Sequence, residues 1–334
     1  MRLLDIIVTH YNEPFETGRK FFEMLALQRC INFNDFRVLL VNDGSDNALD
    51  ESYFLKYPYQ VDILTVNHGG VSAARNAGLE RACAKWVNFC DFDDMYASVF
   101  SLRQVFNVLD SDGFDILYAD FISEDKLKNG KVILHNRGEN LVFIHAKYWR
   151  LEWLKQTGLK FNTTLEFNED SAFCAMASNL VDYKRTGRID TSIPIYVWCF
   201  TENSATTTPG NRIKCLVGLY KRNKVVCEQF KNMEYSRYCA MVSRTIHDAY
   251  WSFNLVELPK EAEQYLEDFK QFWRDHKRQF LDTDPQTMRE VAQASQREHD
   301  IGDAEEEERF LHANTLCVNK NISLAQWLHN LEKG

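Results

Sequence analysis

The sequence predicts an α/β protein with a mostly parallel central sheet, helices on both faces of that sheet, and a C-terminal α-helical region. Three observations support this prediction. Short apolar runs alternate with helical patterns through about the first 120 residues. The runs are apolar throughout rather than alternating, which is typical of parallel strands covered on both faces. From about residue 211, long amphipathic helical patterns replace them.

The predicted strands of the first part end in polar or glycine-bearing loops. They cover residues 3–9, 37–42, 61–66 and 85–90, with helices at 16–28 and 71–84 between them. Further along, we predict a helix over 98–109, a strand over 115–121, a polar hairpin over 123–136, a helix through Met176 that Phe167 to Asp170 opens, and a last strand over 193–200. Parallel strands place their carboxyl ends at one edge, so the polar loops should gather where α/β proteins bind nucleotides.

The segment from Ala205 to Gly210 interrupts the strand and helix patterns. We therefore predict a first domain over residues 1–208 and a helical region over residues 209–334. No internal repeat is visible.

The composition predicts a globular intracellular protein. The 334 residues are 45% apolar, no run of about 20 apolar residues could span a bilayer, and the start lacks a signal-peptide pattern. We therefore expect a cytoplasmic location. The nine cysteines are scattered and mostly lie in apolar stretches, as at Cys83, Cys90, Cys174 and Cys199, which favours reduced core residues. A net charge of -9 argues against a protein that coats nucleic acid by bulk electrostatics.

Three carboxylates follow the fourth strand directly, at Asp91, Asp93 and Asp94. Carboxylate oxygens are hard ligands that suit Mg²⁺ or Mn²⁺, and a strand end delivers them to the edge where nucleotides bind. The alternative is a polar turn in which Asp93 or Asp94 caps the next helix. The segment alone does not decide between a cation site and a cap.

Four ordered motifs resemble the family 2 glycosyltransferases, which have the GT-A fold. They are Ile6 to Glu13, Val41 to Ser45, Gly69 to Gly78, and the DxD-like Asp91 to Asp94. The resemblance covers roughly residues 3 to 205 and implies a metal-dependent, inverting hexosyl- or pentosyltransferase. Its donor would be a nucleotide-sugar, by family habit a UDP-sugar, and its cofactor a divalent cation, Mn²⁺ or Mg²⁺.

The resemblance also assigns roles at the donor site. Asp93 is the expected direct metal ligand, with Asp91 contacting the ribose or reaching the ion through water. Arg75 would approach the nucleotide phosphates or hold the Asp loop, unless it is a structural arginine. Tyr11 could stack on the base or pack at a strand end, and Asp43 could bind a ring N–H or serve turn chemistry. The remaining donor-binding residues implied by these motifs are Thr9, Asn12, Glu13 and Phe92.

Inverting transfer requires a base that removes the acceptor hydroxyl proton. Glu169-Asp170 resembles the family's ED motif, so Asp170 is the implied base and Glu169 an orienting residue. Either carboxylate could instead stabilise the start of a helix through its dipole.

Two departures from the family pattern concern the donor site. The loop after the last strand lacks a histidine, so a third protein ligand for the metal is in doubt. Phe92 is bulkier than the usual small residue at the middle DxD position, and could narrow the sugar pocket or pack under the loop. The C-terminal helical region matches no known pattern; it could bind the acceptor, form oligomers or act as a lid.

The acceptor hydroxyl is expected on a saccharide or protein. The alternative acceptor is DNA with hydroxylated bases, motivated by the basic stretch from Lys214 to Arg244, which could equally be a solvated helix face. An alternative of another class is a non-catalytic nucleotide-sugar sensor or scaffold, against which the intact carboxylate pairs argue. A nucleotidyltransferase would place a glycine-rich basic loop after the first strand, and Tyr11 to Pro14 is not one.

Overall fold

The computed structural model describes residues 2–333, apart from 48, 139–141, 192, 203, 205–207, 209–210, 256–257, 300–318 and 320. The chain divides into two compact units. The first contains residues up to 125 together with 132–201, and the second contains 126–131 together with the residues from 202 onward. The predicted boundary segment lies almost wholly outside the described residues, so the division at 208 stays a prediction. None of the described helices is long and apolar enough to cross a membrane, and the cytoplasmic location stays a prediction.

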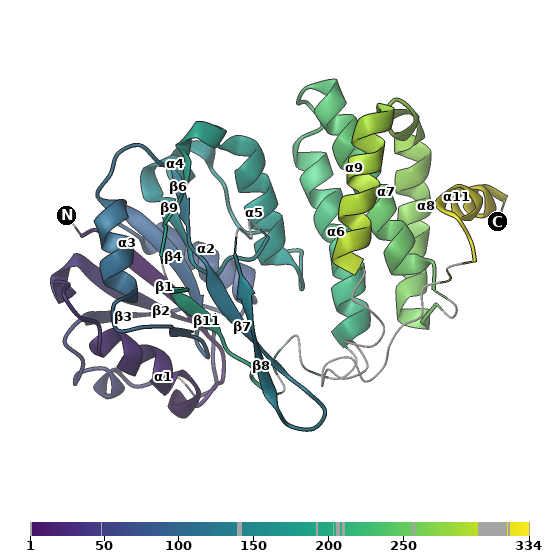
Figure 1. Cartoon of the computed structure of the whole chain (residues 1–334). Helices are drawn as coiled ribbons and strands as arrows, with labels where there is room; N and C mark the ends of the chain where they lie inside the picture. The colour runs from purple at the N-terminus through teal and green to yellow at the C-terminus, as the bar shows by residue number, and fades with distance from the viewer. Residues whose placement is uncertain are drawn as a thin grey trace. The chain divides into compact units, whose positions relative to one another are not determined.

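A seven-stranded sheet forms the centre of the first unit (Figure 1), in the order β10-β6-β9-β4-β1-β2-β3. Only β9 runs antiparallel to its neighbours, β4 and β6, so the predicted mostly parallel sheet is confirmed. The strands are β1 (Leu4–His10), β2 (Phe36–Asn42), β3 (Gln60–Thr65), β4 (Trp86–Asp91), β6 (Ile116–Tyr118), β9 (Lys147–Arg150) and β10 (Thr186–Arg188).

Helices cover both faces of this sheet. Successive residues of a strand point to opposite faces, and in β1 the residues on both faces are apolar and buried. The helices are α1 (Phe15–Ala26), α2 (Val71–Arg81), α3 (Ser101–Leu109), α4 (Leu151–Thr157) and α5 (Glu169–Leu180), with short 3₁₀ turns at Phe33–Asp35, Glu51–Tyr53 and Tyr183–Arg185. Ile6 and Val8 belong to the core that α1 and α3 cover. Ile7 faces α2, where a Cβ on Gly78 would lie 2.5 Å from its Cγ2, so only glycine lets this helix approach so closely.

A second sheet was not predicted. It has four strands in the order β5-β11-β7-β8, namely β5 (Met95–Tyr96), β7 (Phe121–Lys126), β8 (Val132–Arg137) and β11 (Tyr196–Trp198). The single strand predicted over 115–121 is wrong, because the chain leaves the large sheet after β6 and enters the small one as β7. The polar hairpin is confirmed as β7 and β8, whereas the last strand is much shorter than predicted.

The second unit consists of helices, as the sequence predicts. They are α6 (Asn211–Gln229), α7 (Tyr235–Phe253), α8 (Lys260–Leu281), α9 (Pro285–His299) and α11 (Leu324–Lys333). Helices α6 to α9 lie side by side (Figure 1). Helices α6, α7, α8 and α11 supply the apolar core, with Tyr220, Val242, Phe269 and Trp327 among its residues. The acidic run Glu305 to Glu308 lies outside the described residues.

Several cations of the basic stretch contact groups of their own helical unit. Arg244 Nε donates to the fully buried Asp248 at 2.9 Å, and Arg222 Nη2 lies 3.5 Å from the same carboxylate. Lys224 Nζ lies 2.7 Å from Asp268, and Lys221 Nζ lies 4.3 Å from the ring centroid of Tyr265. The stretch therefore gives no support to a DNA-binding surface.

The cysteines fit the reduced state, because all eight that the structure describes are free. Cys90, Cys174 and Cys199 are buried, as predicted. Cys83 is exposed, and its prediction as a core residue is wrong.

Candidate active site

The loops after β1, β2 and β4 meet at one edge of the large sheet, as predicted. Thr9 pairs with Val41 of β2 on one side and with Asp91 of β4 on the other. This register places the loop after β1 directly beside the turn from Asp91 to Asp94, called the carboxylate turn below.

The loops after β1 and β2 are tied together by Asn12. Its backbone has a positive φ of 62°, which asparagine tolerates better than most residues. The Asn12 N–H donates to Ser45 Oγ at 2.9 Å, and its Oδ1 accepts from the Asp46 N–H at 2.9 Å. Asn12 therefore shapes the loop, and its contact with a donor stays a prediction.

Asp43 organises the turn that leads into α2. Its buried carboxylate accepts hydrogen bonds from His68 Nδ1 at 2.8 Å and from the N–H groups of Gly69 and Gly70 at 2.9 Å each. Turn chemistry, the alternative considered for Asp43, is therefore observed. A contact between Asp43 and a base stays a prediction.

Tyr11 presents a half-exposed ring beside this turn. The ring stacks on His68 with centroids 4.1 Å apart, and 44% of the residue is exposed. The Tyr11 N–H donates to Glu13 Oε2 at 2.8 Å. Burial raises the pKa of Glu13 above its usual value. The exposed aromatic face is suited to stacking on a planar base.

Arg75 joins the carboxylate turn to the predicted catalytic pair. Its Nη2 donates to Asp91 Oδ1 and its Nη1 to Glu169 Oε1, both at 2.8 Å. The Arg75 side chain is only 4% exposed, and its guanidinium lies 5.3 Å from the ring centroid of Phe161. Of the roles considered for Arg75, holding the Asp loop is the one observed.

The Arg75 bridge sets the charge of its partners unequally. Burial acts to raise the pKa of Asp91, but the charge and hydrogen bond of Arg75, together with His145, outweigh it and hold that pKa below its usual value. Burial and the adjacent Asp170 raise the pKa of Glu169 to about 7 despite Arg75. Asp170 is partly exposed in the first turn of α5, where its Oδ1 accepts from the Ser171 N–H at 2.7 Å.

Asp94 is held by hydrogen bonds from β11 of the small sheet and from the residues that follow it. It is fully buried and accepts hydrogen bonds from the Tyr196 hydroxyl and the Cys199 N–H, both at 2.8 Å. The Tyr196 hydroxyl also accepts from the Asp91 N–H at 3.2 Å. The prediction that Asp94 caps a helix is wrong, because β5 follows it and no side chain caps α3.

Phe92 and Asp93 complete the turn. Phe92 is 1% exposed and packs so closely on α1 that a Cβ on Gly18 would lie 2.4 Å from its ring. This is packing under the loop, and the buried ring gives no support to the predicted donor contact. Burial raises the pKa of Asp93, which interacts with the side chain of Thr201.

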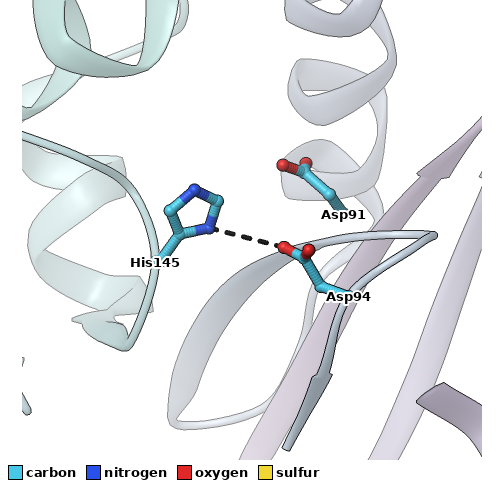
Figure 2. A group of neighbouring side chains, drawn as sticks. All are labelled: Asp91, Asp94 and His145. Carbon is cyan, nitrogen blue, oxygen red and sulfur yellow. Dashed lines mark ion pairs between the residues drawn. The ribbon is translucent and has the colours of Figure 1, made fainter. Parts of the chain in front are cut away.

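His145 lies beside these carboxylates and was missed by the sequence analysis. One ligand atom each from Asp91, Asp94 and His145 lie within 4.8 Å of one another, and Figure 2 shows the imidazole directed at Asp94. Burial lowers the pKa of His145 to about 4, so the ring is neutral at neutral pH. Flanked by apolar Ile144 and Ala146, it looks in the sequence like an ordinary core histidine.

The donor set of this cluster fits a divalent cation. Two carboxylates and a neutral imidazole are ligands that Mn²⁺ and related ions accept. The Nδ1 atom of His145 is buried and has no hydrogen-bond partner among the residues that the structure describes. An unpaired polar atom of this kind requires an explanation.

A sequence model described as "Glycosyl transferase family 2" matches residues 5–182, more than half of the chain. The chain belongs to glycosyltransferase family 2. The segment contains all four motifs and the Glu169-Asp170 pair, so the resemblance drawn from the sequence is confirmed.

Curated relatives and solved structures agree with this family. The uncharacterized glycosyltransferase EpsJ of Bacillus subtilis (strain 168) is 24% identical over 236 residues, which are 62% of this chain and 64% of EpsJ. The minor teichoic acid biosynthesis protein GgaA of the same strain is 28% identical over 192 residues, 51% of this chain and 42% of GgaA. The chain thus spans less than two thirds of either relative.

The crystal structure of S. aureus TarS in complex with UDP has a similar fold. Its TM-score is 0.64 at 17% sequence identity, and the match covers 90% of this chain and 89% of that chain. The likeness extends beyond residues 5–182 and confirms the predicted GT-A fold with a helical C-terminal region.

Proposed function

We propose that this family 2 member is an inverting glycosyltransferase that moves a sugar from a UDP-sugar to an acceptor hydroxyl. The Arg75 bridge is the observation that supports this most strongly. One guanidinium contacts both Asp91 of the carboxylate turn and Glu169 of the ED pair at 2.8 Å. The carboxylate turn and Glu169, the residue directly before the proposed base, thus belong to one hydrogen-bonded unit.

Asp170 is proposed as the general base. It follows Glu169 in the first turn of α5, where the helix dipole favours an ionised carboxylate. There it would accept the proton of the acceptor hydroxyl as that oxygen attacks the sugar. Glu169 would act as a positioning residue, because its hydrogen bond to Arg75 fixes the start of the helix relative to Asp91.

The donor is proposed to lie over the loops after β1 and β2. Tyr11 would stack on the base, while Thr9, Asn12, Glu13 and Asp43 would hold the base and ribose edges. A divalent cation held by Asp91, with Asp93 as the ligand predicted from sequence, would stabilise the charge that develops on the diphosphate leaving group. TarS has been crystallised with UDP and with UDP-GlcNAc, which supports a uridine donor for this chain.

The acceptor is proposed to be a glycan rather than DNA. GgaA is named for minor teichoic acid biosynthesis, which favours an acceptor among polymeric glycans. Arg222, Lys224 and Arg244 of the basic stretch pair with carboxylates of their own unit, so these cations do not favour a nucleic acid.

The proposal is tested by incubating the protein with a panel of nucleotide-sugars, with Mn²⁺ or chelator, and measuring nucleotide release. We expect metal-dependent release from a UDP-sugar, its loss in Asp170→Asn, and unchanged UDP binding by that variant. Asp112→Asn is a control, because the Asp112 side chain is 88% exposed and pairs with Lys85, at the end of β4 opposite to Asp91. Donor binding without turnover in any acceptor mixture would instead favour a sensor, and the absence of binding would refute the proposal.

A further inference from the structure

His145 Nδ1 is a buried nitrogen without a hydrogen-bond partner among the described residues. The side chain is 4% exposed, and Nδ1 lies 3.7 Å from Asp94 Oδ2, too far for a hydrogen bond. Buried polar atoms are nearly always paired. The atom therefore points to a partner that binds between the imidazole and the two carboxylates (Figure 2).

Aromatic packing fixes the direction of this nitrogen. The His145 ring stacks with Tyr196, with centroids 5.5 Å apart, and with Trp198, with centroids 5.2 Å apart. The next residue, Ala146, has a positive φ of 54°, so the backbone turns sharply beside the ring. The imidazole is thus held in place with Nδ1 aimed at the cluster.

The cluster has nearly the size of a cation site. Its three ligand atoms lie within 4.8 Å of one another. Ligands bound at about 2.1 Å can be at most about 4.2 Å apart across one ion. Only one pair of three ligands can reach that separation, so each atom would have to move by roughly half an ångström toward a common centre to reach coordination distance.

Both carboxylates keep lone pairs for an ion. Arg75 contacts Asp91 through Oδ1, which leaves Oδ2 without that bond. Asp94 Oδ2 accepts a hydrogen bond from the Tyr196 hydroxyl and Oδ1 accepts one from the Cys199 N–H, and a carboxylate oxygen has two lone pairs. Asp93, in contrast, interacts with Thr201 and belongs to no cluster of three ligands among the described residues.

We propose that His145 is a protein ligand of the divalent cation, through Nδ1, together with Asp91 and Asp94. The inference rests on the proposed function for the role of the ion, and it assigns a third ligand that the sequence analysis placed in doubt. It also moves the second carboxylate ligand from Asp93 to Asp94.

The test measures the metal rather than the reaction. Mn²⁺ is titrated into the protein, with and without UDP, and followed by electron paramagnetic resonance, with pulsed measurements to detect nitrogen bound to the ion. His145→Phe keeps an aromatic ring in the stack but removes the ligand atom. We expect nitrogen coupling in the wild type, its loss in His145→Phe, and at least about tenfold weaker Mn²⁺ binding, since even outer-shell changes at metal sites cost 10- to 100-fold.

Two further variants separate ligation from folding. His145→Asn offers an amide oxygen near the Nδ1 position, so it should retain part of the affinity without nitrogen coupling. His276→Phe is the matched control, because His276 stacks on Phe272 in the helical unit, and it should bind Mn²⁺ like the wild type. Asp94→Asn should weaken binding more than Asp93→Asn does.

Three results would overturn the proposal. They are Mn²⁺ binding without nitrogen coupling, nitrogen coupling that is unchanged in His145→Phe, and no Mn²⁺ binding either with or without UDP. Coupling that depends on His145 in a protein that releases no nucleotide from any donor would retain the cation site and refute the transferase function instead.

Discussion

Replacing Arg75 with methionine tests the bridge between the carboxylate turn and the ED pair. Methionine preserves much of the side-chain volume but removes both 2.8 Å hydrogen bonds and leaves Asp91 and Glu169 as unpaired acids. Removing one partner from a buried ion pair typically costs about 3–5 kcal/mol. The Asp91 side chain is 30% exposed, so water compensates part of the loss, and we expect about 3 kcal/mol.

The loss should appear in both stability and turnover. For a unit of this size, about 3 kcal/mol lowers the melting temperature by roughly 6–12 °C. Calorimetry on Arg75→Met measures this shift, and the nucleotide-release assay should show turnover lost even well below the melting temperature. Arg19→Met is the control, because Arg19 pairs with Glu16 on the exposed surface of α1, and its removal should leave melting unchanged. If Arg75→Met melts and turns over like the wild type, the argument from the bridge is wrong.

Three other predictions follow from the same structure. Gly78→Ala should lower the free energy of unfolding by roughly 1–2 kcal/mol in urea titrations, because the overlap with Ile7 and Val41 costs more than the gain in helix propensity. Gly113→Ala is the control, since the space around Gly113 is open. Equal urea midpoints for Gly78→Ala and the wild type would contradict this prediction. Asp248→Ala should cost about 3–5 kcal/mol, since it leaves Arg222 and Arg244 without this buried carboxylate, and unchanged helical circular dichroism melting would refute it. Because the pKa of Glu169 is raised to about 7, the native state binds a proton at this group that the unfolded chain has already lost, so its contribution to stability falls as the pH rises from about 4.5 to about 7. Glu169→Gln should remove this fall in urea titrations across that range. An unchanged dependence of stability on pH would count against the raised pKa of Glu169.

Much of the large sheet could be predicted because its strands are local signals. The residues of β1 and β2 form uninterrupted apolar runs, and the predicted ranges 3–9 and 37–42 differ from the observed strands by one residue at most at each end. The motif residues were found for the same reason, since Asp91 and Asp170 stand in short segments with a fixed order.

The small sheet and the position of His145 were missed because both depend on contacts between residues far apart in the sequence. The run from Ile116 to Phe121 carries only Asp120 as a polar interruption, so nothing local shows that the chain changes sheets there. Phe121 joins the small sheet by pairing with Tyr196, a contact far apart in sequence. His145 was missed for a similar reason, because only the fold brings this apolar segment beside Asp94.

The anchoring of Asp94 limits how short a working piece of this protein can be. The family match ends at residue 182, yet Tyr196 and Cys199, which hold the Asp94 carboxylate, come later in the chain. A fragment of the matched residues would retain six adjacent strands of the large sheet but lack β11 and with it both donors. During synthesis, the carboxylate turn would emerge long before its anchor does. The last step in shaping this turn therefore waits for residues that lie outside the family's own signature.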